Sequence, residues 1–246
     1  MHTAKLELIP SRYHFLSGSM LKLLAVVSML IDHTASVLLR SSPIVLLTIG
    51  RRTLKLYTAM RLIGRLAFPI FAFLLVEGFL HTHDRRKYGT RLLAFAVISE
   101  IPWDLEHTAA MFRWSSQNVF FTLFVGYLGL CVVERLLKSE EGRVKYTLAL
   151  LALLVASVLL KSDYGCSGFG FVLTMYLLRE QPLFQAVVGS CFLGSRWQAG
   201  IAFIPLNLYN GERGFIKGRI LQILFYAVYP LHMLLLYYIR LRTIGY

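Results

Sequence analysis

Long apolar runs separated by short polar segments dominate the pattern of this chain. The runs cover about residues 21–39, 62–80, 91–105, 119–137, 145–160, 167–178, 184–195, 197–209 and 220–239. A membrane-spanning helix needs about 20 mainly apolar residues, and several runs are shorter than that. Short runs can form tilted, broken or re-entrant helices that neighbouring helices shield from lipid. The pattern therefore predicts an all-α, polytopic transmembrane helical bundle with about eight to ten spans, some of them short or broken.

The basic residues between the runs indicate how the chain is oriented. Segments 83–91, 138–145 and 210–219 are basic, and alternation across the membrane puts all three on one side, which the positive-inside rule makes cytoplasmic. Segment 106–118 is poor in Lys and Arg, as an outer loop would be. Segment 40–61 conflicts with this scheme, because it holds five basic residues yet alternation places it outside. A re-entrant or interfacial helix there would remove the conflict.

The domain plan that follows from these segments is simple. The chain shows no repeat of fixed period and no low-complexity stretch. We predict that residues 1–14 form a short cytoplasmic lead and that residues 15–246 form a single transmembrane domain.

Composition and charge agree with a membrane protein. Apolar residues make up 57% of the chain and charged residues 16%, against about 45–50% and 25% in soluble domains. The mean hydropathy is +0.61. These values disfavour a disordered chain, a disulfide-framed secreted module and a coiled coil. A net charge of +13 on a soluble protein would suggest nucleic acid, but these cations lie between apolar runs. We therefore predict membrane lipids as partners and no nucleic acid.

Ionisable side chains within the first run are the strongest indication of chemistry. Lys22 and His33 are eleven residues apart, which is about three helical turns, so both lie on nearly the same face about 16 Å apart. Lys22 could meet an anionic ligand at the mouth of a tunnel while His33, beside Asp32, acts deeper as a general base. The alternatives are an interfacial lysine anchor and a hydrogen-bonded core histidine. Because ionisable groups at membrane depth are costly, we favour function for His33 with Asp32.

The second and third runs add a cation and two carboxylates. Arg65 is a candidate for holding a phosphate or an oxyanion, or for pairing with Glu77 or Glu100. Glu77 lies near the cytoplasmic end, where pairing with arginines of segment 83–91 is the simpler interpretation. Glu100 lies in an apolar stretch beside a proline, which is typical of a broken helix that lines a polar cavity. It could orient His33 or serve as the counter-ion of Arg65.

Four further polar residues are candidates for binding or support. Asn118 could hydrogen-bond an acyl carbonyl or cap a helix. Asp163, beside Tyr164, could bind substrate or cap a helix. His232 could work with the first histidine, bind substrate or sit in an aromatic belt. Neither a metal-ligand spacing nor a nucleotide-binding loop is evident, so we expect no metal and no ATP- or NAD-driven reaction.

Several of these segments resemble one known family. The matching strings are 21–33 (LKLLAVVSMLIDH), 64–79 (GRLAFPIFAFLLVEGF), 91–103 (RLLAFAVISEIPW), 117–123 (QNVFFTL), 163–165 (DYG), 225–226 (FY) and 229–232 (YPLH). In this order they resemble the TraX family, whose activity is acetylation of the N-terminus of conjugative pilin. That family is similar to the acyltransferase-3 superfamily, which carries a basic residue, ten residues and then His in its first span, and Lys22 and His33 match this spacing.

The resemblance implies a membrane acetyltransferase of the bacterial inner (cytoplasmic) membrane. Acetyl-CoA would be the donor and would be held from the cytoplasmic side by Lys22, Arg65 and Arg91. The catalytic group would be His33 with Asp32 and Glu100. The substrate-binding or supporting residues would be Glu77, Asn118, Asp163, Tyr164 and His232. A peptide amine or a glycan hydroxyl at the outer face would accept the acetyl group. The alternatives are a transporter or channel and a non-catalytic envelope-assembly protein.

Overall fold

The computed structural model describes residues 8–49, 52–138 and 140–243, and it confirms the all-α class. The helices are α1 (Gly18–Leu38), α2 (Leu56–Gly64), α3 (Ala67–His81), α4 (Arg85–Ile98), α5 (Glu100–Thr108), α6 (Val119–Lys138), α7 (Arg143–Leu159), α8 (Gly165–Leu177), α9 (Pro182–Phe192), α10 (Phe203–Asn207) and α11 (Arg219–Thr243). The 3-10 helices are Ser11–Tyr13 and Gly194–Ala202. The strands are β1 (Val45–Ile49) and β2 (Arg52–Lys55).

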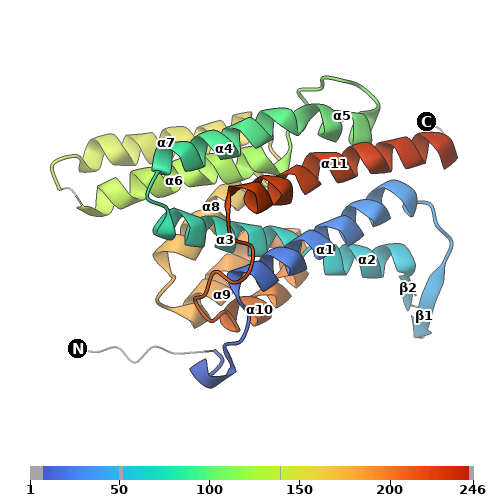
Figure 1. The fold of residues 1–246 in the computed structure, drawn as a ribbon, viewed down its shortest axis with the longest axis horizontal. Coiled ribbons are helices and arrows are strands. Elements are labelled where there is room, and N and C mark those ends of the chain that lie inside the picture. The colour runs from blue at the N-terminus through green and yellow to red at the C-terminus, as the bar shows by residue number, and fades with distance from the viewer. Residues whose placement is uncertain (1–7, 50–51, 139, 244–246) are drawn as a thin grey trace.

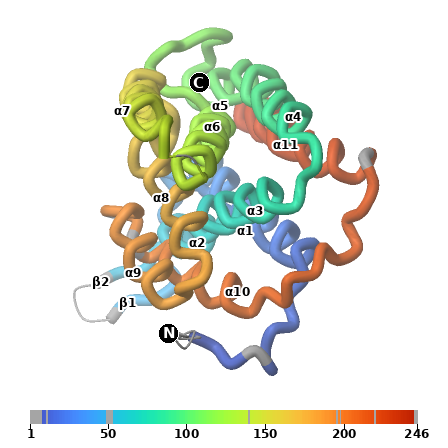
Figure 2. The backbone as a smooth tube through the Cα atoms, turned by 90° about the vertical axis from the view of Figure 1, so that its left-hand side faces the viewer, coloured from blue at the N-terminus to red at the C-terminus, as the bar shows by residue number. Residues whose placement is uncertain are grey.

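The longer helices run roughly along the long axis of the molecule and form a bundle (Figures 1 and 2). Helix α3 lies in its middle, in contact with α1, α6 and α8. Ile70, Ala72 and Phe79 of α3 are fully buried, because this helix is apolar on nearly every face. Helices α4, α7 and α8 pack on α6, and α11 packs on α1 and α5. This arrangement places α1, α3, α4 and α11 around a common space.

The lengths of the helices agree with a membrane protein and limit how many helices can cross a membrane in full. By length and composition, the described residues contain four stretches that can cross a membrane, at 18–38, 56–81, 119–138 and 220–243. The other apolar runs form helices of at most 17 residues. Four of the predicted spans are therefore long enough to cross a membrane in full, and the short or broken ones that the prediction allowed for form helices that pack against the long ones. Leucines on the outer faces of α7 and α11 are exposed, as lipid-facing side chains are.

The predicted run 62–80 is broken into two helices. Helix α2 ends at Gly64 and α3 begins at Ala67. Pro69 explains the break, because proline cannot donate to the carbonyl of Arg65 and its ring crowds that carbonyl. Gly64 permits the close approach of α1, since a Cβ at this position would collide with the side chain of Asp32.

Residues 40–61 do not form the re-entrant or interfacial helix that the charge pattern suggested. They form the β1–β2 hairpin, with Thr48 opposite Thr53, followed by the start of α2. Figure 1 shows this hairpin at the same end of the bundle as the end of α11. Residues 50 and 51 of this segment and residues 1–7 of the predicted lead lie outside the described residues.

Candidate functional site

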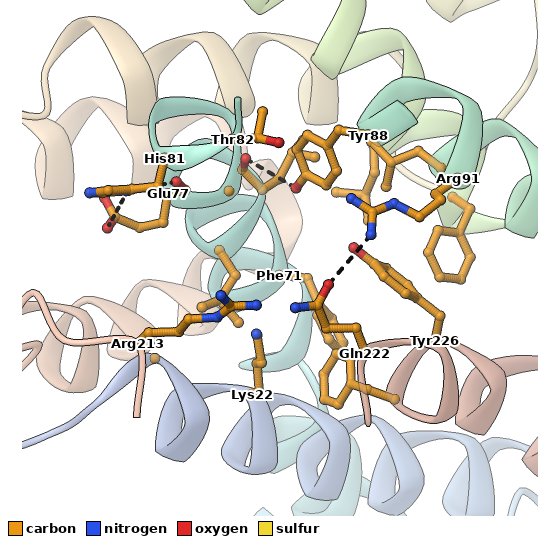
Figure 3. Close-up of a pocket in the computed structure, with 18 of the residues that line it drawn as sticks. Lys22, Phe71, Glu77, His81, Thr82, Tyr88, Arg91, Arg213, Gln222 and Tyr226 are labelled. Carbon is orange, nitrogen blue, oxygen red and sulfur yellow. Dashed lines mark hydrogen bonds and ion pairs between the residues drawn. The ribbon is translucent and has the colours of Figure 1, made fainter. Parts of the chain in front are cut away.

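A cavity of about 470 Å³ opens between α1, α3, α4, α11, the start of α6 and the segment that precedes α11. Its walls are mainly apolar and aromatic, and they include Val26, Met29, Phe71, Leu92, Phe120, Leu123 and Tyr226. A small number of polar side chains lie among them (Figure 3). A concave, largely apolar space of this size with a few polar groups is typical of a small-molecule or cofactor site.

Three cations line this cavity. Lys22 comes from α1, Arg91 from α4 and Arg213 from the segment before α11 (Figure 3). Arg91 donates a hydrogen bond from Nη1 to Oε1 of Gln222 at 3.4 Å, while Ser19 donates to the main-chain carbonyl of Arg213. The structure thus places Lys22 and Arg91 in the lining of the same cavity. Arg213 was missed, because its segment reads simply as a basic loop.

Glu77 also lines the cavity, but it does not pair with the arginines of segment 83–91. One of its carboxylate oxygens lies 3.8 Å from Nδ1 of His81. Arg85, one of the expected partners, pairs with Glu134 instead. The helical spacing of four residues between Glu77 and His81 explains the contact. The described lining of the cavity therefore holds three Lys or Arg side chains, the histidines His81 and His83, and the carboxylate of Glu77.

One aromatic side chain of the cavity wall also contacts the predicted catalytic histidine. Tyr229 of α11 lines the cavity, whereas His33 does not, and the two ring centroids are 6.2 Å apart. His232, one turn further along α11, has its ring centroid 4.9 Å from that of His33. The structure thus brings His232 and His33 together. The ring of Tyr229 contacts both imidazoles.

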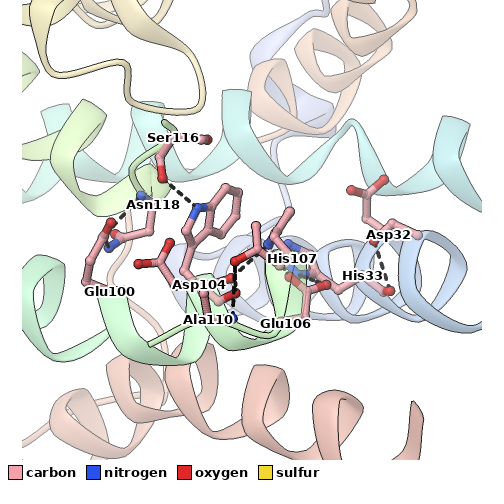
Figure 4. A network of polar contacts seen from close by, with 12 residues as sticks. Asp32, His33, Glu100, Asp104, Glu106, His107, Ala110, Ser116 and Asn118 are labelled. Carbon is pink, nitrogen blue, oxygen red and sulfur yellow. Dashed lines mark hydrogen bonds and ion pairs between the residues drawn. The ribbon is translucent and has the colours of Figure 1, made fainter. Parts of the chain in front are cut away.

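Glu106 of α5 is the carboxylate nearest to this pair (Figure 4). Its Oε1 lies 3.9 Å from Nδ1 of His33, and its other oxygen pairs with His107. The side chain of Glu106 is only 2% exposed. Nδ1 of His33 makes no hydrogen bond at this separation, but a nearby carboxylate favours a proton on Nδ1 and a lone pair on Nε2. Glu106 was missed by the sequence analysis because the chain gives no local link between α1 and α5.

The second histidine has a defined tautomer. Nδ1 of His232 lies 2.9 Å from the carbonyl oxygen of Val228. Because a carbonyl can only accept, Nδ1 carries the proton and Nε2 carries the lone pair. That Nε2 is buried and has no hydrogen-bond partner among the described residues. The pair therefore offers two imidazole nitrogens with lone pairs beside Tyr229 of the cavity wall.

Two predicted partners of His33 are placed elsewhere. Asp32 forms an ion pair with Arg61 of α2, because its side chain leaves α1 on the side that faces α2. Glu100 accepts hydrogen bonds from the main chain and the side chain of Asn118 (Figure 4). Neither carboxylate orients His33 in this structure. Glu106 occupies that position instead.

Arg65 is separated from the cavity that holds Lys22 and Arg91. It donates from Nη1 to Oε1 of Gln198 at 2.9 Å, and it pairs with neither Glu77 nor Glu100. The turn between α2 and α3 directs this side chain toward the 3-10 helix that follows α9. The geometry therefore does not support the predicted role of Arg65 beside the other two cations.

The remaining candidates have structural contacts. Asn118 caps α6, since its Oδ1 accepts from the main-chain N–H of Phe120 at 3.0 Å. Asp163 makes no side-chain cap on α8 and lies 3.5 Å from a guanidinium nitrogen of Arg196. Tyr164 stacks on Phe68 with ring centroids 3.6 Å apart. Asp163, Tyr164 and Arg196 line a second, smaller pocket of about 250 Å³.

Comparison with known proteins gives the family. Residues 17–240 match the model of the TraX protein family. The chain belongs to the TraX family. This TraX-family chain is 30% identical over 244 residues to the probable fimbrial assembly protein FimC, serogroup H1, of Dichelobacter nodosus, an alignment that covers 89% of this chain and 94% of the relative. No solved structure gives a significant match.

The match confirms the family resemblance found in the sequence and covers both sides of the cavity. It includes Lys22 and His33 of α1 as well as Tyr229 and His232 of α11. Within the described residues of this TraX-family protein, no group of three or more His, Cys, Asp or Glu side chains is placed to hold a metal ion. The chemistry that the described site offers is thus that of cations, imidazoles, a carboxylate and a tyrosine.

Proposed function

We propose that this protein is an integral membrane acetyltransferase that moves an acetyl group from acetyl-CoA to an acceptor of the cell envelope. The observation that carries the proposal is a cavity with Lys22, Arg91 and Arg213 in its lining and an imidazole pair in contact with Tyr229 of its wall. The name of the Dichelobacter relative, a fimbrial assembly protein, supports an acceptor that belongs to a pilus or fimbria. The bacterial inner membrane is the corresponding location.

The cavity suits the donor in both charge and shape. Lys22, Arg91 and Arg213 offer charge-assisted hydrogen bonds to the phosphates of coenzyme A. The aromatic and aliphatic walls suit the thin pantetheine arm that ends in the thioester. The cations lie beside segments 83–91 and 210–219, which the charge pattern assigns to the cytoplasm, where acetyl-CoA is made. A donor seated in this way directs its acetyl group toward Tyr229 and the imidazole pair.

The imidazole pair supplies the base for the transfer. An acceptor amine or hydroxyl attacks the thioester carbonyl carbon, and Nε2 of His33 takes the proton that the acceptor loses. Glu106, 3.9 Å from Nδ1, stabilises the imidazolium that results. His232, with its Nε2 lone pair free of described partners, is placed to share this proton or to replace His33 as the base. The proton is finally delivered to the departing thiolate of coenzyme A.

The test is acetyl transfer by the purified protein in lipid nanodiscs. Radiolabelled acetyl-CoA is supplied with a synthetic peptide that has a free N-terminal amine, or with the same peptide blocked at that amine. In parallel, mass spectrometry compares the acetylation of envelope polymers and surface peptides in cells with and without the protein. Together these two measurements detect an amine or a hydroxyl acceptor.

Histidine variants make the test specific. His33→Ala should abolish transfer while the protein stays folded. His14→Ala is the matched control, because His14 does not line the cavity and its Nε2 lies 3.1 Å from the carbonyl oxygen of Ile9. Transfer by His33→Ala at the rate of the unaltered protein would refute the mechanism. Solute flux in proteoliposomes without consumption of acetyl-CoA would point to a transporter instead.

A further inference from the structure

The hydroxyl of Tyr229 is buried in the cavity wall, where its oxygen faces the main-chain N–H of Val119 and its O–H finds no acceptor among the described residues. Only 5% of the residue is exposed, and its side chain lines the cavity. A buried tyrosine normally finds a partner for its O–H, because an unmade hydrogen bond is costly. An unsatisfied group of this kind in a cavity wall indicates that a ligand supplies the missing partner.

The surroundings of Tyr229 identify the part of the ligand it meets. On one side its ring lies 6.2 Å from that of His33 and 5.7 Å from that of His232. On the other side it packs edge-on against Phe120, with ring centroids 5.1 Å apart. Tyr229 therefore stands between the space for the donor and the two basic nitrogens. This is the point that the reacting carbonyl of a donor must reach.

The N-terminus of α6 favours negative charge at the same point. Val119 and Phe120, the first two residues of this 20-residue helix, line the cavity together with Tyr229. The N-terminus of a helix carries a partial positive charge of about half an elementary charge, which favours an anion nearby. Asn118 caps this end and holds it in place. Negative charge that develops beside Tyr229 is thus stabilised both by a donor and by a dipole.

We propose that Tyr229 is a catalytic residue whose O–H donates a hydrogen bond to the carbonyl oxygen of the donor thioester and to the oxyanion that forms from it. This inference rests on the proposed acetyl transfer and adds to it the group that stabilises the oxyanion. When the acceptor attacks, its new bond to the carbonyl carbon pushes the carbonyl electron pair onto oxygen, where Tyr229 holds it. When that pair returns, the carbon–sulfur bond breaks and the thiolate of coenzyme A leaves. The proton lost by the acceptor passes to the imidazole pair and then to the thiolate.

Tyr229→Phe tests this role because it removes only the hydroxyl and keeps the ring that packs on Phe120 and His33. Loss of one oxyanion donor lowers kcat by about 100- to 1,000-fold in enzymes of known mechanism. We expect a loss of about 100-fold or more in kcat, with the Kd for coenzyme A changed less than about threefold. We also expect the melting temperature in detergent to change little, since no acceptor of the Tyr229 O–H is lost.

Tyr127→Phe is the matched control. Tyr127 is similarly buried, 4% exposed, but it does not line the cavity and its hydroxyl donates to the main-chain carbonyl of Arg85 at 2.6 Å. This variant should keep its kcat and lower the melting temperature, the opposite of Tyr229→Phe. Loss of activity without loss of stability cannot result from a merely structural role of Tyr229.

The outcomes separate the inference from the proposed function. If the unaltered protein transfers no acetyl group to any acceptor, the proposed function fails and this inference fails with it. If the unaltered protein is active and Tyr229→Phe keeps its kcat within about threefold, only the role of Tyr229 is overturned. A lower melting temperature for Tyr229→Phe, together with weaker binding of coenzyme A, also overturns it, because the hydroxyl would then support the fold.

Discussion

Replacing Glu106 by Gln tests whether the carboxylate beside His33 supports catalysis. Glutamine has nearly the same shape, so the variant removes the negative charge and little else. The Oε1 of Glu106 lies 3.9 Å from Nδ1 of His33, and the side chain is 2% exposed. Two unit charges at about 4 Å attract by about 4 kcal/mol at an effective dielectric constant of about 20. That value is an upper limit here, because Glu106 also pairs with His107.

The expected loss in kcat depends on how much of this attraction acts on the imidazolium of His33. If half or more of it stabilises the imidazolium of the transition state, the variant loses about 2–3 kcal/mol, or about 30- to 150-fold in kcat. The KM for acetyl-CoA should change little, because Glu106 does not line the donor cavity. The measurement is steady-state transfer of radiolabelled acetyl groups by protein in nanodiscs, over a range of acetyl-CoA concentrations.

A second carboxylate provides the control. Glu134 pairs with Arg85 and Lys138 away from the imidazole pair, so Glu134→Gln should leave kcat unchanged. Asp32→Asn addresses the competing assignment, in which the neighbour of His33 in sequence orients its ring. If Asp32→Asn lowers kcat by about 100-fold while Glu106→Gln does not, the geometric reasoning is wrong.

Three further predictions concern the cavity and the helices that frame it. Arg91→Ala should raise the KM for acetyl-CoA by about 10-fold or more without changing kcat, because it removes a charge-assisted contact with a phosphate. An unchanged KM in the same kinetic assay would contradict the placement of the phosphates. Gly64→Ala should destabilise the protein by about 1–3 kcal/mol, since the added Cβ collides with the side chain of Asp32; thermal unfolding in detergent measures this loss. Asn118→Ala should lower the stability by about 1–3 kcal/mol in the same measurement, because it removes the cap of α6 and the donor to Glu100. Asn118→Ser keeps the cap and should lower the stability less. Equal losses of stability in the two variants would refute the capping role.

The sequence analysis succeeded where an arrangement depends on one helix. The eleven-residue spacing of Lys22 and His33 predicted a cation at one end of a face and an imidazole further along it. In the structure Lys22 lines the cavity and His33 contacts Tyr229 of its wall. The cap by Asn118 is equally local, and it is present. Hydropathy alone does not show which of the short helices are covered by others.

The assignment of partners failed where it crossed from one helix to another. Asp32 was expected to assist His33 because the two are adjacent in sequence, but adjacent residues on a helix point about 100° apart. Asp32 consequently meets Arg61 on α2, while His33 meets Glu106 on α5. Arg65 likewise reaches Gln198 rather than the cavity cations. No periodic pattern in the sequence indicates these contacts between helices.

The sequence by itself determined the class of protein, its family and the polar face of the first helix, since hydropathy and helical periodicity are properties of consecutive residues. Only the tertiary structure decided which groups surround His33. The packing of α11 against α1 and α5 brings His232, Tyr229 and Glu106 next to His33, beside the wall of one cavity. Close packing of side chains between helices fixes such neighbours, and it depends on the shapes of all the helices at once.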